Sequence, residues 1–264
     1  MKPEQWDIFK RAAKGRPVEQ IPLALIIDSP WIPGYLGISH LDYFLDPQVW
    51  FQANLQILEA FPEVIFIPSW WIEFGMAIEP AAMGAIAQFA KHDTPSVHPA
   101  LHRLEDIEHL APVDPHTNSL MALALHLYEK QKKRIFETGY TLPLATARGP
   151  LCTAAFLRGV SPFMMDLIEN PELIHCLLEK TTAMTLAWLK AQADGIMEPF
   201  QSVIMGFWHT DVLPDQVGIN MTHLVDVDTT NARHLTWGTI EGRRQAHHLV
   251  DVFRQVVPGM EQCY

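Results

Sequence analysis

Short apolar runs alternate along this chain with longer segments in which apolar residues recur at helical spacing. The runs read IPLALIID, EVIFIPSWW, TLPLATARGP, GIMEPF, SVIMGFWHTD, GINMTHLVDVD and HLTWGTI, at residues 21–28, 63–71, 141–150, 195–200, 202–211, 218–228 and 234–240. Near-continuous apolar runs of this length are typical of strands buried on both faces. They therefore predict a parallel sheet that is covered by helices.

The segments between these runs carry helix signals. Residues 46–61 begin with Asp-Pro, and residues 119–139 have a serine N-cap candidate, a basic last turn and a final glycine. Residues 163–195 predict two helices that are interrupted at Asn170-Pro171, and residues 1–17 predict an amphipathic helix. The alternation of strand and helix patterns predicts a βα architecture.

The length of 264 residues is close to the roughly 250 that are typical of a (β/α)8 barrel. We count seven candidate strands, and no linker, repeat or low-complexity segment divides the chain. We therefore predict one α/β domain over residues 1–264, a TIM-type (β/α)8 barrel.

Composition excludes several classes of protein. Nineteen Lys and Arg residues against 30 Asp and Glu give a net charge of −11, which disfavours binding to nucleic acid. Three scattered cysteines, Cys152, Cys176 and Cys263, suit a reducing compartment rather than a disulfide framework. With neither a signal peptide nor an apolar stretch of about 18 residues, we expect a cytoplasmic protein without a membrane span.

In a parallel βα barrel the active site lies at the carboxyl ends of the strands. This rule selects Asp28, Trp70, Trp71, Glu73, Arg148, Glu198, His209, Asp211, Asp226, Asp228, Trp237 and Thr239, with Phe74 close by. Tryptophans mixed with carboxylates, one arginine and one histidine suit a flat organic ligand that has polar substituents.

Most of these residues also have a structural interpretation. Asp28, which precedes Ser-Pro, is equally suited to cap a turn or helix. The cluster of Trp70, Trp71 and Phe74 is also what core packing produces. Arg148 would either bind a substrate carboxylate or phosphate or pair with an acidic neighbour.

Two glutamates lie among apolar residues. Glu73 and Glu79 stand in the sequence WWIEFGMAIEPAAMG. A carboxylate in such surroundings must be paired, solvated or shifted in pKa, so a role in a site and a structural role are about equally plausible.

The sequence WHTD places His209 and Asp211 on the same side of an extended segment. Such a pair would serve as a general base with its orienting carboxylate, or as two ligands of one metal ion. Two ligands do not define a zinc site, and the chain contains no GxSxG, HExxH or Walker lysine motif.

Three segments together resemble the uroporphyrinogen decarboxylase-like superfamily, over residues 1–200. The first is the opening FKRAAKGRPVEQIPLALIID, and the second is EVIFIPSWWIEFGMAIEPAAMGA, which is similar to the corrinoid-linked members. The third runs from LATARGPL through the helix DLIENPELIHCLLEK to ADGI. This resemblance implies a TIM-type barrel with its site at the carboxyl ends of the strands.

The resemblance implies one of two chemistries. The decarboxylases hold a tetrapyrrole with arginines and an aspartate near the first strand, whereas their relatives transfer a methyl group from a corrinoid protein to an acceptor such as a zinc-activated thiol. Here SPWIPGYLG follows the first strand without an arginine-rich segment. His209-Thr210-Asp211 stands where the methyltransferases have His-x-Cys, and the last third is shorter than in the family.

We therefore expect an enzyme that acts in corrinoid-linked methyl transfer to a small acceptor. Asp28, Trp70, Trp71, Glu73, Phe74 and Arg148 would bind the substrate, and Glu198, His209 and Asp211 would be catalytic, with His209 as a zinc ligand. A partner protein would deliver the corrinoid, and a homodimer would cover apolar surface left by the short last third. The alternatives are decarboxylation of a tetrapyrrole polycarboxylate and a non-catalytic barrel that binds a tetrapyrrole or corrinoid.

Overall fold

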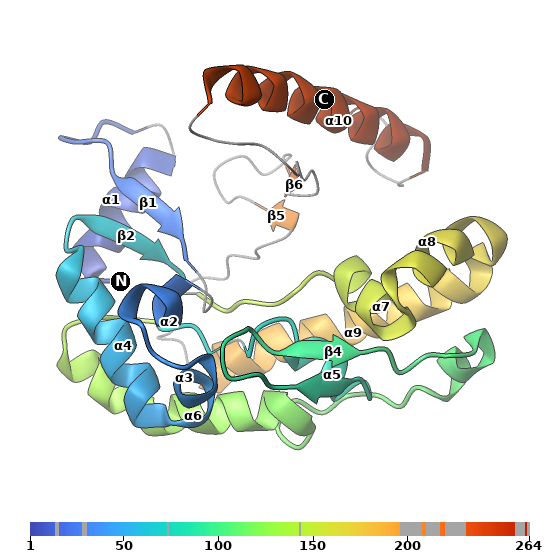
Figure 1. Ribbon diagram of the computed structural model, residues 1–264, viewed down its shortest axis with the longest axis horizontal. Coiled ribbons are helices and arrows are strands. Elements are labelled where there is room, and N and C mark those ends of the chain that lie inside the picture. The colour runs from blue at the N-terminus through green and yellow to red at the C-terminus, as the bar shows by residue number, and fades with distance from the viewer. Residues whose placement is uncertain are drawn as a thin grey trace. The chain divides into compact units, whose positions relative to one another are not determined.

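The computed structural model describes residues 1–13, 16–27, 31–72, 74–142, 144–195, 207–209, 217–219, 231–256 and 262. Two compact units divide the chain, Met1–Gly218 and Ile219–Tyr264. The first unit is rich in helices and has few strands (Figure 1).

The elements of the first unit follow one another in this order: α1 (Pro3–Ala13), β1 (Leu23–Ile26), α2 (Trp31–Leu36), α3 (His40–Leu45), α4 (Pro47–Ala60), β2 (Val64–Ile67), α5 (Ile78–Ala82), β3 (Ile86–Gln88), β4 (Ser96–His98), the 3-10 helix η1 (Leu104–His109), α6 (Ser119–Glu137), α7 (Pro150–Arg158), α8 (Val160–Glu169), α9 (Pro171–Gly195) and β5 (Phe207–His209). Strand β6 (Val217–Ile219) pairs with β5 in a two-stranded sheet. The second unit contains α10 (Ala232–Val256).

Strands β1 and β2 form a two-stranded parallel sheet. Their register aligns Leu23 with Val64 and Ile26 with Ile67, and helices α2, α3 and α4 connect them. All four residues of β2 are buried, which agrees with the prediction for a strand covered on both faces. On β1, by contrast, Leu23 is 54% exposed. The described residues thus contain one parallel βα unit rather than a closed barrel.

The predicted helices are confirmed. Helix α4 begins after Asp46, whose carboxylate accepts the N–H groups of Gln48 at 2.7 Å and Val49 at 3.4 Å. The segment predicted at residues 119–139 forms α6, and the predicted break at Asn170-Pro171 separates α8 from α9. The N-terminal amphipathic segment forms α1.

Two of the predicted strands are wrong. Residues 234–240 lie inside α10, where the side chain of Asn231 caps the helix by accepting the N–H groups of Arg233 and His234. Trp237 and Thr239 therefore lie on a helix and not at a strand end. No strand forms among the described residues of 141–150, where the backbone N–H and C=O of Thr146 bond to the side chain of Gln192.

The remaining strand predictions have mixed outcomes. Strand β5 lies within the run at residues 202–211, and β6 overlaps the start of the run at 218–228. The run at 195–200 lies outside the described residues apart from Gly195, which ends α9. The antiparallel pair of β3 and β4 was not predicted.

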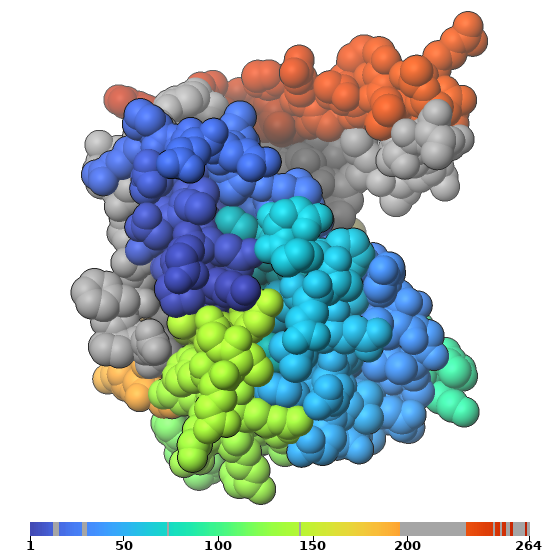
Figure 2. All heavy atoms as spheres, turned by 90° about the vertical axis from the view of Figure 1, so that its left-hand side faces the viewer, coloured from blue at the N-terminus to red at the C-terminus, as the bar shows by residue number. Residues whose placement is uncertain are grey.

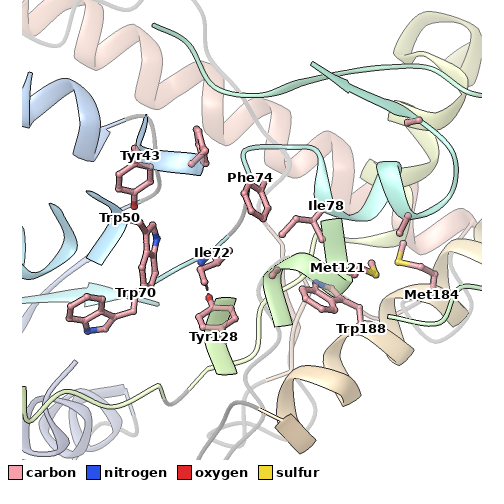
Figure 3. Close-up of a cluster of buried hydrophobic side chains, with 14 of the residues drawn as sticks. Tyr43, Trp50, Trp70, Ile72, Phe74, Ile78, Met121, Tyr128, Met184 and Trp188 are labelled. Carbon is pink, nitrogen blue, oxygen red and sulfur yellow. Dashed lines mark hydrogen bonds between the residues drawn. The ribbon is translucent and has the colours of Figure 1, made fainter. Parts of the chain in front are cut away.

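The core lies between β2 and helices α4, α6, α7 and α9, and it is rich in large side chains. Figure 3 shows six of its buried members: Trp50, Trp70, Phe74, Met121, Met184 and Trp188. Others are Phe51, Leu157, Phe163 and Leu177. Burial of each such side chain stabilises the fold by roughly 1.5–3 kcal/mol. Figure 2 shows α1, α4 and the end of α6 on one face of the molecule, where α4 packs against α6.

A buried ion pair joins α7 to α8. The Nε of Arg158 donates to Asp166 at 2.7 Å, and its Nη1 donates to the carbonyl oxygens of Leu101 at 3.0 Å and His102 at 2.9 Å. The amide of Asn170 donates to the other oxygen of Asp166. Arg158 therefore has a structural role, which is to join α7 to α8.

Among the described helices, none by itself has both the length and the apolar character needed to cross a membrane. Helices α7 and α8 are long and apolar enough only when they are counted together. The chain bends by 106° between them.

Candidate functional site

The segment that follows β2 forms the wall of the candidate site. Ser69 and Trp70 have φ angles of 60° and 56°, a left-handed conformation that is uncommon for residues other than glycine. The Trp70 side chain is fully buried and packs on Phe51, with 5.0 Å between the ring centroids. Packing of Trp70 thus holds this turn and sets the position of the next residue, Trp71.

Hydrogen bonds from two helices fix Trp71 and Ile72. The Nε1 of Trp50 on α4 donates to the carbonyl oxygen of Trp71 at 3.3 Å. The N–H of Ile72 donates to the hydroxyl of Tyr128 on α6 at 2.7 Å (Figure 3). The wall of the site is therefore anchored to the core on both sides.

A hollow opens beside this wall. It is lined by Trp71, Ile72, Gly75, Ile78, Glu79, Thr146, Arg148 and Trp188. The lining combines two indole rings with one guanidinium and one carboxyl group around a space of about 10 Å³, close to what one water molecule needs.

Arg148 is attached to the wall at two points. Its backbone N–H donates to Oε1 of Glu79 at 2.9 Å, and its Nη2 donates to the carbonyl oxygen of Gly75 at 2.8 Å. Gly75 has a φ of 61°, and a Cβ there would lie 2.8 Å from the carbonyl oxygen of Pro95. Only glycine fits at this position, so the approach of Arg148 depends on it.

Glu79 is buried on α5. Burial raises the pKa of its carboxyl group, while the charge of Arg148 and the hydrogen bond from the Arg148 backbone act in the opposite direction. The site therefore holds an acidic group whose protonated form is favoured relative to an exposed glutamate. Such a group can donate or accept a proton at the hollow.

Gln192 on α9 holds the opposite wall. Its Oε1 accepts the N–H of Thr146 at 3.1 Å, and its Nε2 donates to the carbonyl oxygen of Thr146 at 2.8 Å. One side-chain amide thus supplies both bonds that a neighbouring strand would supply. The backbone of Thr146 is thus paired with a side chain of α9 and not with a strand.

Cys152 lies on the first turn of α7 and interacts electrostatically with both charged groups. Although the residue is exposed at the surface, desolvation of its thiol by the surrounding protein raises the pKa; the charge of Arg148 lowers it and that of Glu79 raises it. The thiol of Cys152 therefore senses the charges at the hollow.

Of the residues predicted from the sequence to form the site, the structure brings Trp71 and Arg148 together at one hollow. Trp70 and Phe74 are buried in the core, with exposed fractions of 0% and 1%, and each touches a neighbouring hollow.

The other predicted residues are not described at the level of side chains. Asp28, Glu73, Glu198 and Asp211 lie outside the described residues, as do Asp226 and Asp228. His209 ends β5, where only its backbone is described.

Several residues of the site were missed in the sequence. Thr146, Trp188 and Gln192 carry no local signal beyond an apolar run or helical spacing, because their role depends on how α9 packs against residues 144–148. Gly75 offered a weak signal, since a glycine among aromatic residues often marks a close approach of the backbone. Glu79 was singled out as a carboxylate among apolar residues.

The described side chains form no metal centre. Within that part of the chain, no three His, Cys, Asp or Glu side chains come together as they would around a metal ion. The described residues therefore do not by themselves form a zinc site.

A parallel strand pair, helices packed against it and a polar hollow beyond the strand end describe an α/β domain with a candidate site. The family model for uroporphyrinogen decarboxylase (URO-D) matches residues 5–197, well over half of the chain. The chain belongs to the URO-D family, a superfamily that includes decarboxylases and methyltransferases. Among curated proteins, none matches this sequence.

A solved structure has a similar fold. A methyltransferase from Methanosarcina mazei superposes with a TM-score of 0.59 and is 19% identical, and the similarity covers 76% of this chain and 57% of that one. This chain therefore spans little more than half of that methyltransferase. At this level of identity the similarity shows a shared fold.

Proposed function

We propose that this chain is a URO-D-family enzyme that binds an anionic small molecule at Arg148 and acts in corrinoid-linked methyl transfer to a small acceptor. The hollow that joins Arg148 and the buried Glu79 to Trp71 and Trp188 is the observation that supports this proposal. A TIM-type barrel is part of the same proposal, and the parallel β1–β2 unit with its connecting helices supports it.

Methyl transfer is favoured over tetrapyrrole decarboxylation because cationic groups are scarce at the hollow. Of the described residues in its lining, Arg148 is the only arginine or lysine. Arg158, the other arginine considered for this role, is paired with Asp166. One guanidinium suits one anionic group, whereas a tetrapyrrole polycarboxylate presents several. The fold shared with a methyltransferase agrees with this preference.

In this proposal each residue has a distinct task. Arg148 binds the anionic group of the acceptor, and the indoles of Trp71 and Trp188 contact its body. Glu79 holds the backbone of Arg148 and exchanges a proton with the bound molecule. Glu198, His209 and Asp211 stay candidates for proton transfer, with Asp28 and Glu73 as binding residues.

The cofactor and the partners are further parts of the proposal. A corrinoid, delivered by a partner protein, would supply the methyl group, and a zinc ion on His209 would activate a thiol acceptor. Association of two copies would cover exposed apolar residues such as Leu23 on β1. Metal analysis and light scattering of the purified protein test the zinc ion and the dimer directly.

Parallel assays on the purified full chain test the proposed activity. The first assay supplies methylcobalamin and 3-mercaptopropionate and measures the loss of the cobalt-bound methyl group. The second assay supplies uroporphyrinogen and measures the formation of coproporphyrinogen. We expect turnover in the first assay, its loss in Arg148→Gln, and normal turnover in Arg103→Gln, which changes an exposed arginine outside the hollow. Turnover of uroporphyrinogen alone would establish the decarboxylase alternative. Binding without turnover in either assay would establish the non-catalytic one.

A further inference from the structure

Helix α8 has an exposed apolar face. Val160, Met164, Met165 and Ile168 are 56%, 57%, 56% and 81% exposed. Three of them are spaced four residues apart and Met165 follows Met164, so the four side chains lie on one side of the helix. The opposite side carries the buried Phe163 and packs against α7 and α9 (Figure 1).

Contacts on the buried side fix the orientation of α8. The side chain of Phe163 is 0% exposed and belongs to the main core. Asp166 accepts from Nε of Arg158 at 2.7 Å, which ties α8 to the end of α7. Since a helix cannot rotate without breaking both contacts, Met164 and Met165 stay on the solvent side.

These two methionines differ from the other methionines that the structure describes. Met76 is half-buried, and four others, with exposed fractions between 0% and 7%, are Met1, Met83, Met121 and Met184. A dissolved oxidant reaches a buried sulfur only when the surrounding structure opens. It reaches the sulfurs of Met164 and Met165 in the folded state.

We propose that Met164 and Met165 form an oxidation site for hydrogen peroxide, through which the exposed face of α8 changes from apolar to polar. The thioether sulfur forms a bond to one peroxide oxygen while the O–O bond breaks. Sulfur loses two electrons, the peroxide is reduced to one water molecule, and the product is methionine sulfoxide. Methionine sulfoxide reductases reverse this modification, so the site can be switched in both directions.

The modification acts on the surface and leaves the fold intact. A sulfoxide is polar and would disrupt a core, but on this face its oxygen remains in water. The buried contacts of Phe163 and Asp166 do not involve the two sulfurs. Oxidation should therefore lower the hydrophobicity of the surface without lowering the denaturation midpoint.

Peroxide treatment of the full chain tests the reactivity of the pair. Tandem mass spectrometry of the digested protein follows the oxygen added to each methionine over time. Met164 and Met165 should gain oxygen at least about tenfold faster than the buried Met121 and Met184. Equal rates at the four positions, or faster oxidation of the buried pair, would overturn the inference.

Hydrophobic-interaction chromatography tests the change of the α8 face. Oxidised wild type should elute earlier than the untreated protein, and Met164→Leu combined with Met165→Leu should lose this shift, because leucine keeps the apolar volume but has no sulfur. All other methionines and the cysteines are common to both proteins. Met76→Leu is the matched control and should shift as the wild type does.

Three outcomes would contradict the proposed change of surface. They are an equal shift in the double variant, oxidation of Met164 and Met165 without any shift, and a lower urea midpoint of the wild type once these two residues alone are oxidised. None of these measurements involves methyl transfer, so the inference and the proposed function fail independently.

Discussion

The side-chain carboxylate of Glu79 accepts the backbone N–H of Arg148 at 2.9 Å, although 69 residues separate them in the sequence. This bond joins α5 to the residues that lead into α7, and so it closes the hollow on one side. It also places an acidic group and a guanidinium on the same wall, with Cys152 close enough to respond to both.

Replacement of Glu79 by glutamine should make the stability of the protein less dependent on pH. The folded-state pKa of Glu79 is raised above its ordinary value of 4.5 by burial, so the folded state binds the proton more tightly than the unfolded state. The stability that Glu79 contributes is thus fully present below pH 4.5 and is lost as the pH rises through the folded-state pKa. Glutamine has no such titration.

Urea denaturation of both proteins between pH 4 and pH 8 measures this effect. The free energy of unfolding of the wild type, minus that of Glu79→Gln, should fall with rising pH by no more than about 1.4 kcal/mol per pH unit. A difference that rises with pH would show that the charge of Arg148 outweighs burial and that the pKa of Glu79 is lowered. Glu169→Gln, on the surface of α8, controls for the loss of one charge.

Replacement of Gln192 by alanine should destabilise the protein and impair the hollow. It removes the partners of both Thr146 backbone groups, which are buried, and each unsatisfied group costs about 1–3 kcal/mol. We expect a loss of about 2 kcal/mol or more in urea denaturation, together with slower turnover in the methyl-transfer assay. Unchanged turnover would show that the position of Arg148 does not depend on this wall.

The sequence predicts the helices well because their signals are local. The Asp46-Pro47 start and the Asn170-Pro171 break act through caps and missing N–H groups within a few residues, and the structure confirms both. An apolar run is less specific, since it does not reveal which partner its backbone will bond. Residues 234–240, for example, form such an apolar run and were predicted to be a strand, but they lie in a helix that Asn231 caps.

Within the described part of the site, the sequence predicts some of the residues that take part but not the contacts that they make. Trp71 and Arg148 meet at one hollow, as their positions after two apolar runs predict. Gln192 and Tyr128, by contrast, act through the packing of α9 and α6, which no short motif encodes. Trp70 is buried because its left-handed backbone turns the ring toward Phe51.

Replacement of Asp166 by asparagine should be strongly destabilising. Asp166 and Arg158 are both largely buried, and Arg158 also bonds to two carbonyl oxygens, so the variant leaves a guanidinium without its counter-charge. Breaking a buried pair in this way typically costs about 3–5 kcal/mol. Denaturation should show a loss in this range, while Glu105→Gln, which breaks the exposed pair with Arg103, should change little.

The alkylation rate of Cys152 should report the charge state of the hollow. Since the thiolate is the reactive form, any change that lowers the pKa of this thiol speeds its reaction with iodoacetamide at pH 8. Arg148 lowers that pKa and Glu79 raises it, so Arg148→Gln should slow the reaction and Glu79→Gln should speed it. Mass spectrometry of the Cys152 peptide measures both rates, with the Cys176 peptide as the internal control. Equal rates in the two variants would show that the thiol does not respond to the pair, whereas opposite shifts would establish Cys152 as a probe for ligands that bind on Arg148.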